Sequence, residues 1–144
     1  MKRHVLVAGL VAVAALISDG TAFAQSAMPP STDVPAPAVR EFEGVRYVTG
    51  GVGEDERAAL RGIARDFNLK LTFAEKSGDY LSGVKIVITR RDGRKVLELD
   101  SEGPLVLAKL PPGGYRISAT ANGREQTRHA NVAGTGQRSL SFYW

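Results

Sequence analysis

Between residues 54 and 68 the apolar positions recur at helical spacing. They fall at i, i+3, i+4 and i+7, which places them in one stripe along a helix, and they are Leu60, Ile63, Ala64 and Phe67. Acidic residues occupy positions 54–56 and arginines follow, the order that the helix dipole favours. The pattern predicts one amphipathic helix over residues 54–68, with Asn68 ending it in the left-handed conformation.

After the helix the apolar positions alternate with polar ones, which is the period of a β-strand with one buried face. Residues 69–73, 84–88 and 115–119 show this alternation clearly, and residues 104–110, apolar on both faces, indicate a central strand. Gly- and Pro-rich turns separate the runs, among them a hairpin turn at Asp92-Gly93. These strands predict a mainly β fold, an antiparallel β-sandwich of about seven strands with the one helix N-terminal to it.

The N-terminus has the organisation of a secretory signal peptide. A basic start at residues 1–4 precedes an apolar run at residues 5–17, and Ala22-Phe23-Ala24 forms a small-residue cleavage site. The apolar run is short for a membrane span. We therefore expect cleavage after Ala24 and a periplasmic or secreted mature chain without a transmembrane segment.

Residues 25–40 are rich in proline and small residues, and such a stretch buries too little apolar area to offset its ordering entropy. We expect a disordered linker there and one folded domain over residues 41–144. The chain has no cysteine, so burial alone must stabilise the domain. Without residues 1–24 the net charge falls from +4 to +3, which is mildly basic and does not predict a nucleic-acid partner.

Three turn motifs carry a family resemblance: Leu110-Pro111-Pro112-Gly113-Gly114-Tyr115, Asp92-Gly93 and Asn122-Gly123. Together with the strands of residues 80–144, they resemble the carboxypeptidase regulatory-like domain, within the wider transthyretin-like (prealbumin-like) sandwiches. The upstream part is similar to small exported bacterial proteins that carry this domain without an assigned function. The regulatory domains are non-catalytic in the enzymes that carry them, so the resemblance implies no catalytic residue and no cofactor.

Two further family resemblances can be tested against particular residues of the sequence. Hydroxyisourate hydrolases of the transthyretin fold end in Tyr-Arg-Gly-Ser and use histidines, whereas this chain ends at 141–144 with Ser-Phe-Tyr-Trp and keeps only His129 after residue 24. Collagen-adhesin repeats form a Lys–Asn cross-link promoted by a glutamate in a Tyr-x-Leu-x-Glu strand. Here Ala119 stands at the glutamate position of residues 115–119, so neither the hydrolase activity nor the cross-link is expected.

Candidate sites for phosphate and metal are weak. Gly50-Gly51-Val52-Gly53 precedes a helix, as an anion loop does, but the acidic residues 54–56 that follow would repel phosphate, which favours a flexible connection. His129 alone cannot build a zinc site and is expected to lie on the surface of a strand. Three acidic residues could supply oxygen ligands for a weak calcium site, although solvated turns explain them better: Asp92, Asp100 and Glu102.

A cluster of cations around one predicted hairpin is the main candidate for binding: Arg90, Arg91, Arg94 and Lys95. It could bind an anionic glycan, a lipid headgroup or an acidic protein patch, or simply keep a sheet edge soluble. Tyr143 is expected to face away from the apolar side of the last strand, where it can stack on a sugar ring.

These observations favour a non-enzymatic exported binding or scaffold module of the cell envelope, whose partner is an envelope protein or polymer. The alternative is a carbohydrate- or peptidoglycan-binding module that uses the basic hairpin and Tyr143. A hydrolase is disfavoured because the sequence shows no nucleophile–base pair and no metal cluster. Residues 110–115 are interpreted as a corner of the chain, with prolines that fix φ on entry and glycines that allow reversal.

Overall fold

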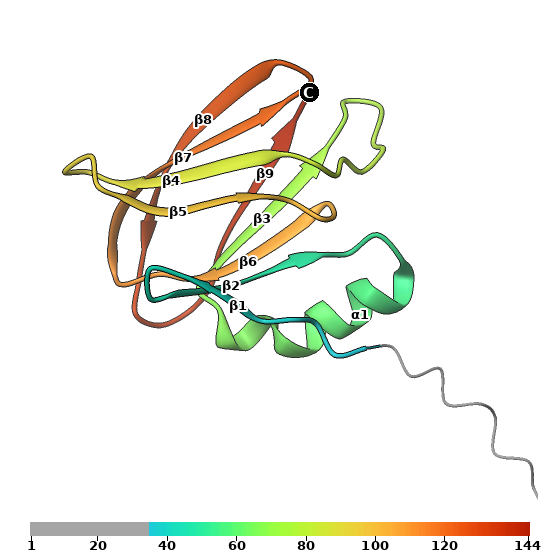
Figure 1. The fold of residues 1–144 in the computed structure, drawn as a ribbon, viewed down its shortest axis with the longest axis horizontal. Helices are drawn as coiled ribbons and strands as arrows, with labels where there is room; N and C mark the ends of the chain where they lie inside the picture. Colours follow the sequence, from blue (N-terminus) through green and yellow to red (C-terminus); the bar gives the residue numbers. More distant parts are fainter. Residues whose placement is uncertain (1–34) are drawn as a thin grey trace, which may run out of the picture. The chain divides into compact units, whose positions relative to one another are not determined.

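Two β-sheets pack face to face in the computed structural model, which describes residues 35–144 (Figure 1). Sheet A has the strand order β1-β2-β6-β3-β9 and sheet B has the order β5-β4-β7-β8. The strands are β1 (Arg40–Phe42), β2 (Val45–Gly50), β3 (Leu69–Ala74), β4 (Lys85–Arg90), β5 (Lys95–Asp100), β6 (Leu105–Lys109), β7 (Gly113–Ala121), β8 (Arg124–Val132) and β9 (Arg138–Tyr143). The predicted mainly β sandwich is confirmed, with nine strands in the described residues.

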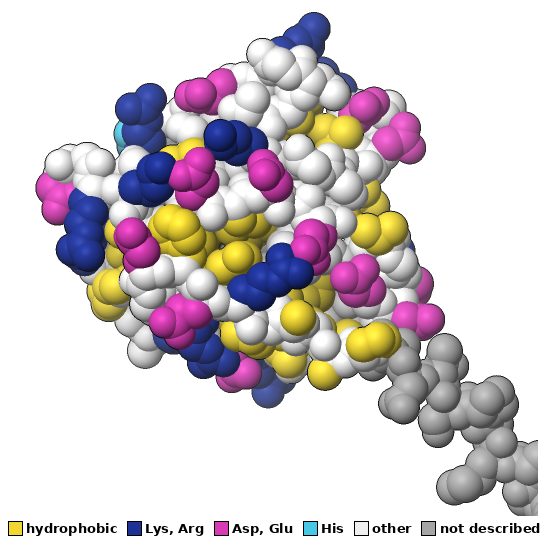
Figure 2. Space-filling model, viewed as in Figure 1, with side chains coloured by type: hydrophobic (Ala, Val, Ile, Leu, Met, Phe, Trp, Pro, Cys, Tyr) yellow, Lys and Arg dark blue, Asp and Glu magenta, His cyan; other side chains and the backbone are white. Residues whose placement is uncertain are grey.

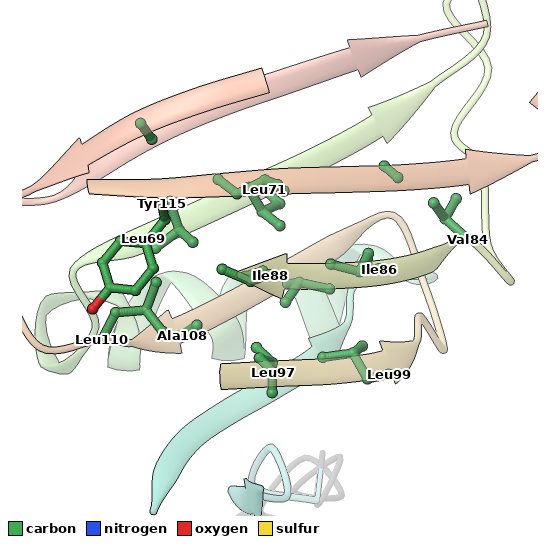
Figure 3. Packing of buried hydrophobic residues seen from close by; sticks show 14 of the residues in the cluster. Leu69, Leu71, Val84, Ile86, Ile88, Leu97, Leu99, Ala108, Leu110 and Tyr115 are labelled. Carbon is green, nitrogen blue, oxygen red and sulfur yellow. The ribbon is translucent and has the colours of Figure 1, made fainter. Parts of the chain in front are cut away.

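The core lies between the two sheets and is built from the alternating apolar positions. Ile86, Ile88, Leu97 and Ile117 of sheet B are buried, and Leu69 and Leu71 of sheet A lie among the core residues that Figure 3 labels. The residues between them in each strand of sheet B therefore face outward. This alternation is what places polar side chains on the outer surface of sheet B.

The central strand of sheet A is β6, as its apolar sequence predicted. Its Val106 and Ala108 belong to the core between the sheets, whereas Leu107 packs on the opposite face with Leu60 and Phe67. Leu60 belongs to α1 (Glu54–Ile63), and the helix therefore covers the outer face of sheet A. Because both faces of β6 are buried, both must be apolar.

The helix prediction is right in its start and its apolar stripe but wrong at its end. The α-helix stops at Ile63, and residues 64–66 form the 3₁₀ turn η1 (Ala64–Asp66). Asn68 is not left-handed, since the non-glycine residues with positive φ in the described chain are Glu43 and Asn122. Asn68 is buried, and its side chain bonds Leu110 instead of serving a helix cap.

Gly62 offers a stabilising substitution within α1. A Cβ added there would meet nothing within 4 Å, and its φ is compatible with an L-residue. Glycine inside a helix loses more conformational freedom than alanine, so Gly62→Ala should raise the free energy of unfolding by about 0.5 kcal/mol. Urea unfolding followed by circular dichroism checks this, and a lower unfolding midpoint for the variant would contradict it.

The strand β9 completes sheet A by pairing with β3 in parallel. The other strand pairs of the described sheets are antiparallel. Phe142 of β9 is fully buried, and its ring centroid lies 5.8 Å from that of Phe73 in β3. The Trp144 ring stacks at 6.1 Å from Phe142, and its indole Nε1 donates to the carbonyl of Arg124. The aromatic end of the chain thus closes the core beside β8.

The segment 110–115 carries the chain from β6 in sheet A to β7 in sheet B, which agrees with its interpretation as a corner. Gly113 has a φ of 154°, and the buried Tyr115 that follows donates its hydroxyl hydrogen bond to the carbonyl of Pro111. This bond ties the first residue of the inward-facing set in β7 back to the corner itself.

The predicted export signal, residues 1–24, lies outside the described residues, as does the linker up to residue 34. Residues 35–39 contain no helix or strand, and β1 begins at Arg40. Within residues 35–144 no helix has the length and apolar character needed to cross a membrane.

Candidate functional site

A cleft of about 530 Å³ lies where sheet B carries the hairpin between β4 and β5. Figure 2 shows blue Lys and Arg side chains around the end of the molecule that bears this hairpin. The cleft contains four arginines and a histidine, and no carboxylate: it is lined by Thr89, Arg90, Arg91, Gly93, Tyr115, Arg116, His129, Ala130, Asn131 and Arg138. A lining of this kind is suited to a negatively charged ligand.

The outer face of sheet B positions three of these side chains next to one another. Arg116 lies between the buried Tyr115 and Ile117, so strand alternation turns it outward. In the strand register Arg116 is opposite Thr89 on β4 and opposite His129 on β8. A hydroxyl, a guanidinium and an imidazole therefore stand side by side across three strands.

Arg91 lies across β7 toward β8 because Gly114 has no side chain. Its Nη2 donates a hydrogen bond of 3.0 Å to Asn131 Oδ1. A Cβ added to Gly114 would lie 2.2 Å from Arg91 Nε. Arg91, which begins the hairpin, is thus held on the outer face of sheet B, beside the position of Arg116 and His129.

None of the four cleft arginines forms an ion pair with an acidic residue in the part of the chain that the structure describes. Other cations do: Arg57 pairs with Glu54 at 2.7 Å, and Lys95 pairs with Glu98 at 2.5 Å. The positive charge of the cleft is therefore not neutralised by neighbouring carboxylates. Since like charges held together repel, an anionic ligand would relieve them.

Only two of the four cations of the predicted binding hairpin line the cleft. Arg90 and Arg91 line the cleft, but Arg94 and Lys95 do not. Arg94 belongs to the hairpin turn, where its backbone N–H donates to Asp92 Oδ1 at 2.9 Å. The hydrogen bond and positive charge of Lys95 lower the pKa of Glu98 below its ordinary value, so Lys95 is engaged within β5.

Tyr143 is exposed as predicted, with 51% of its surface accessible, but it lies on β9 of sheet A and does not line the cleft. His129 is also exposed, as predicted for a surface strand. Its position beside Arg116 was not predicted. The places of Arg116, Asn131 and Arg138 in the cleft were not predicted either.

In the glycine segment before α1, a backbone N–H group is already bonded to a side chain of the helix. The backbone N–H of Val52 donates to Glu56 Oε2 at 3.0 Å, and Gly53 begins the helix as its N-cap. This agrees with the interpretation of residues 50–53 as a connection. Of the calcium candidates, Glu102 pairs with Arg40 at 2.5 Å, and no group of three or more His, Cys, Asp or Glu within residues 35–144 is placed to hold a metal ion.

No protein-family model and no curated protein sequence matches this chain. Among solved structures, the 5-hydroxyisourate hydrolase of Klebsiella pneumoniae is similar to part of it. The likeness covers 54% of this chain and 89% of that one, with 17% sequence identity and a TM-score of 0.44.

Proposed function

We propose that this chain is a non-enzymatic binding module whose basic cleft takes an anionic ligand. The observation that carries the proposal is the gathering of Arg90, Arg91, Arg116 and Arg138 around one cleft, without a carboxylate in its lining and without an ion pair to the described acidic residues. Guanidinium groups form strong, charge-assisted hydrogen bonds with oxyanions, which suits them to this role.

The setting we propose is the cell envelope. The signal-peptide pattern of residues 1–24 supports export, so the module would act in the periplasm or outside the cell. Its partner would be an anionic envelope glycan or an acidic envelope protein. The carboxypeptidase regulatory-like resemblance of residues 80–144 supports a binding role, because those domains are non-catalytic in the enzymes that carry them.

Charge reversal at Arg116 should reduce binding to anionic polymers. The purified protein is expected to stay on resins bearing sulfated or carboxylated polysaccharide and to pass through uncharged dextran. Because Arg116→Glu replaces a charge-assisted donor by a repelling carboxylate, we expect an affinity loss of about tenfold or more, with elution at lower salt.

The matched control is Arg65→Glu, which makes the same change of charge on the exposed surface of η1, at an arginine that, like Arg116, forms no ion pair with the described acidic residues. Its retention should stay close to that of the unchanged protein. Equal losses for the two variants would show that net charge alone governs retention, and the cleft would lose its role. Turnover of an ester, amide or glycoside by the protein after metal removal would contradict the non-enzymatic part of the proposal.

A further inference from the structure

We infer that the anionic group held in the cleft is a phosphate monoester rather than a carboxylate. This inference rests on the proposed function and names the ligand class for the same cleft. It follows from the number of cationic groups, from the elements that carry them, from the way Arg91 is held, and from the volume of the cleft.

The cleft carries more positive charge than one carboxylate group can neutralise. A carboxylate carries one negative charge and two oxygens, and one guanidinium fork satisfies it. Here Arg90, Arg91, Arg116 and Arg138 line one cleft together with His129. A phosphate monoester carries a charge of about −1.5 to −2 at pH 7 and presents three acceptor oxygens. It can accept from several of these groups at once.

The potential donors of the cleft also come from different elements. Arg90 ends β4, Arg116 comes from β7, His129 from β8, and Arg138 from the first position of β9 in the other sheet. A planar carboxylate is best recognised by donors in its own plane, whereas the oxygens of a phosphate point to the corners of a tetrahedron. Donors from four strands of two sheets fit the second arrangement.

One donor is arranged before any ligand arrives. The Nη2 of Arg91 is bonded to Asn131 Oδ1, which fixes the guanidinium above Gly114 and leaves its other N–H groups free to donate. The amide NH₂ of Asn131 and the hydroxyl of Thr89 add neutral donors to the same lining. A donor that is already held in place loses less conformational freedom on binding.

The volume favours an ester over the free ion. The cleft of about 530 Å³ falls in the range of sites that hold whole small molecules. A phosphate group fills a small part of it, and the remainder can receive the sugar or the headgroup to which the phosphate is attached. The ligand thus has either a phosphorylated sugar unit of an envelope polymer or a lipid phosphate as its source.

Titration calorimetry on the purified protein tests the inference with four probes: glucose 1-phosphate, glucuronate, inorganic phosphate and vesicles containing phosphatidic acid. Glucose 1-phosphate should bind about tenfold or more tightly than glucuronate, because it offers more charge and more acceptors to the same groups. It should also bind more tightly than inorganic phosphate. A higher affinity for the vesicles than for glucose 1-phosphate would support a lipid phosphate as the ligand. A higher affinity for glucose 1-phosphate would support a sugar phosphate.

Gly114→Ala separates the arrangement of the donors from their charge. The added Cβ would force Arg91 away without altering the net charge, so affinity for glucose 1-phosphate should fall about tenfold while elution from the anionic resins changes little. The matched control is Gly134→Ala, whose Cβ would meet only Pro112 Cγ at 3.5 Å. Arg91→Lys, which keeps the charge but removes the fork, should behave like Gly114→Ala and covers the case in which that variant folds poorly.

The outcomes separate the two proposals. Equal affinity for glucuronate and glucose 1-phosphate, or equal affinity for inorganic phosphate and glucose 1-phosphate, would overturn the phosphate monoester inference and leave anion binding intact. If the unchanged protein binds none of the four probes and is also not retained on the anionic resins, both the phosphate monoester inference and the proposed anion binding are overturned. Full affinity of Gly114→Ala and Arg91→Lys for glucose 1-phosphate would remove Arg91 from the site.

Discussion

Replacing Gly103 with alanine should lower the free energy of unfolding by about 3 kcal/mol or more. A Cβ built on Gly103 would lie 2.4 Å from both the carbonyl carbon and the oxygen of Gly50. These are backbone atoms, so a change of rotamer cannot relieve the overlap. Gly103 is buried just before β6, at the point where Leu105 pairs with Gly50 of β2. The alanine would therefore push apart two strands of sheet A.

Urea unfolding followed by the fluorescence of Trp144 measures the effect, with Gly134→Ala as the matched glycine control. The control should stay within about 0.5 kcal/mol of the unchanged protein, as surface substitutions usually do. A Gly103→Ala variant as stable as this control would mean that β2 and β6 separate at that end without loss of packing.

Replacing Asn68 with alanine should cost about 2 to 4 kcal/mol of stability, because it leaves buried polar groups without partners. The side chain of Asn68 is bonded to both backbone groups of Leu110: Nδ2 donates to the carbonyl at 2.6 Å, and Oδ1 accepts from the N–H at 2.8 Å. Asn68 is only 3% exposed, so water cannot replace these bonds. The carbonyl of Asn68 also accepts from the backbone N–H of Arg138, at the start of β9.

A thermal melt of Asn68→Ala beside Gln137→Ala separates burial from hydrogen bonding as the cause. Gln137 also donates to two backbone carbonyls, those of Ala64 and Phe67, but it is exposed. Its removal should cost less than about 1 kcal/mol, since water takes over the carbonyls. Asn68→Asp, which keeps the shape but replaces the Nδ2 donor with an acceptor oxygen facing the Leu110 carbonyl, should be as destabilising as the alanine variant. Equal melting temperatures for Asn68→Ala and Gln137→Ala would contradict the prediction.

Much of the fold could be predicted because apolar alternation is a local property of the chain. The run 104–110 was assigned to a central strand from its two apolar faces alone, and β6 is the middle strand of sheet A. The end of the helix could not be assigned in this way. Asparagine is a residue type that often ends a helix, but the side chain of Asn68 bonds Leu110, which is distant in the sequence. A long-range partner decided its conformation.

The candidate site could be predicted in part. Arg90 and Arg91 were found because they are neighbours in the sequence. Arg116 and His129 could also have been found, since the two-residue turn at Asn122-Gly123 fixes the register of β7 and β8 and sets these residues opposite each other. Arg138 could not, because the pairing of β9 with β3 in the other sheet brings it to the cleft.

The parallel pairing of β9 with β3 sets the order in which the sandwich can be completed during synthesis. The edge of β3 is made early, whereas the residues 138–143 that pair with it are made much later. Until then Phe73 lacks the ring of Phe142, and an apolar strand edge stays open on the nascent chain. Pairing between such distant segments is intrinsically slow. A chaperone that shields open strand edges is thus most useful to this protein in the interval before β9 arrives.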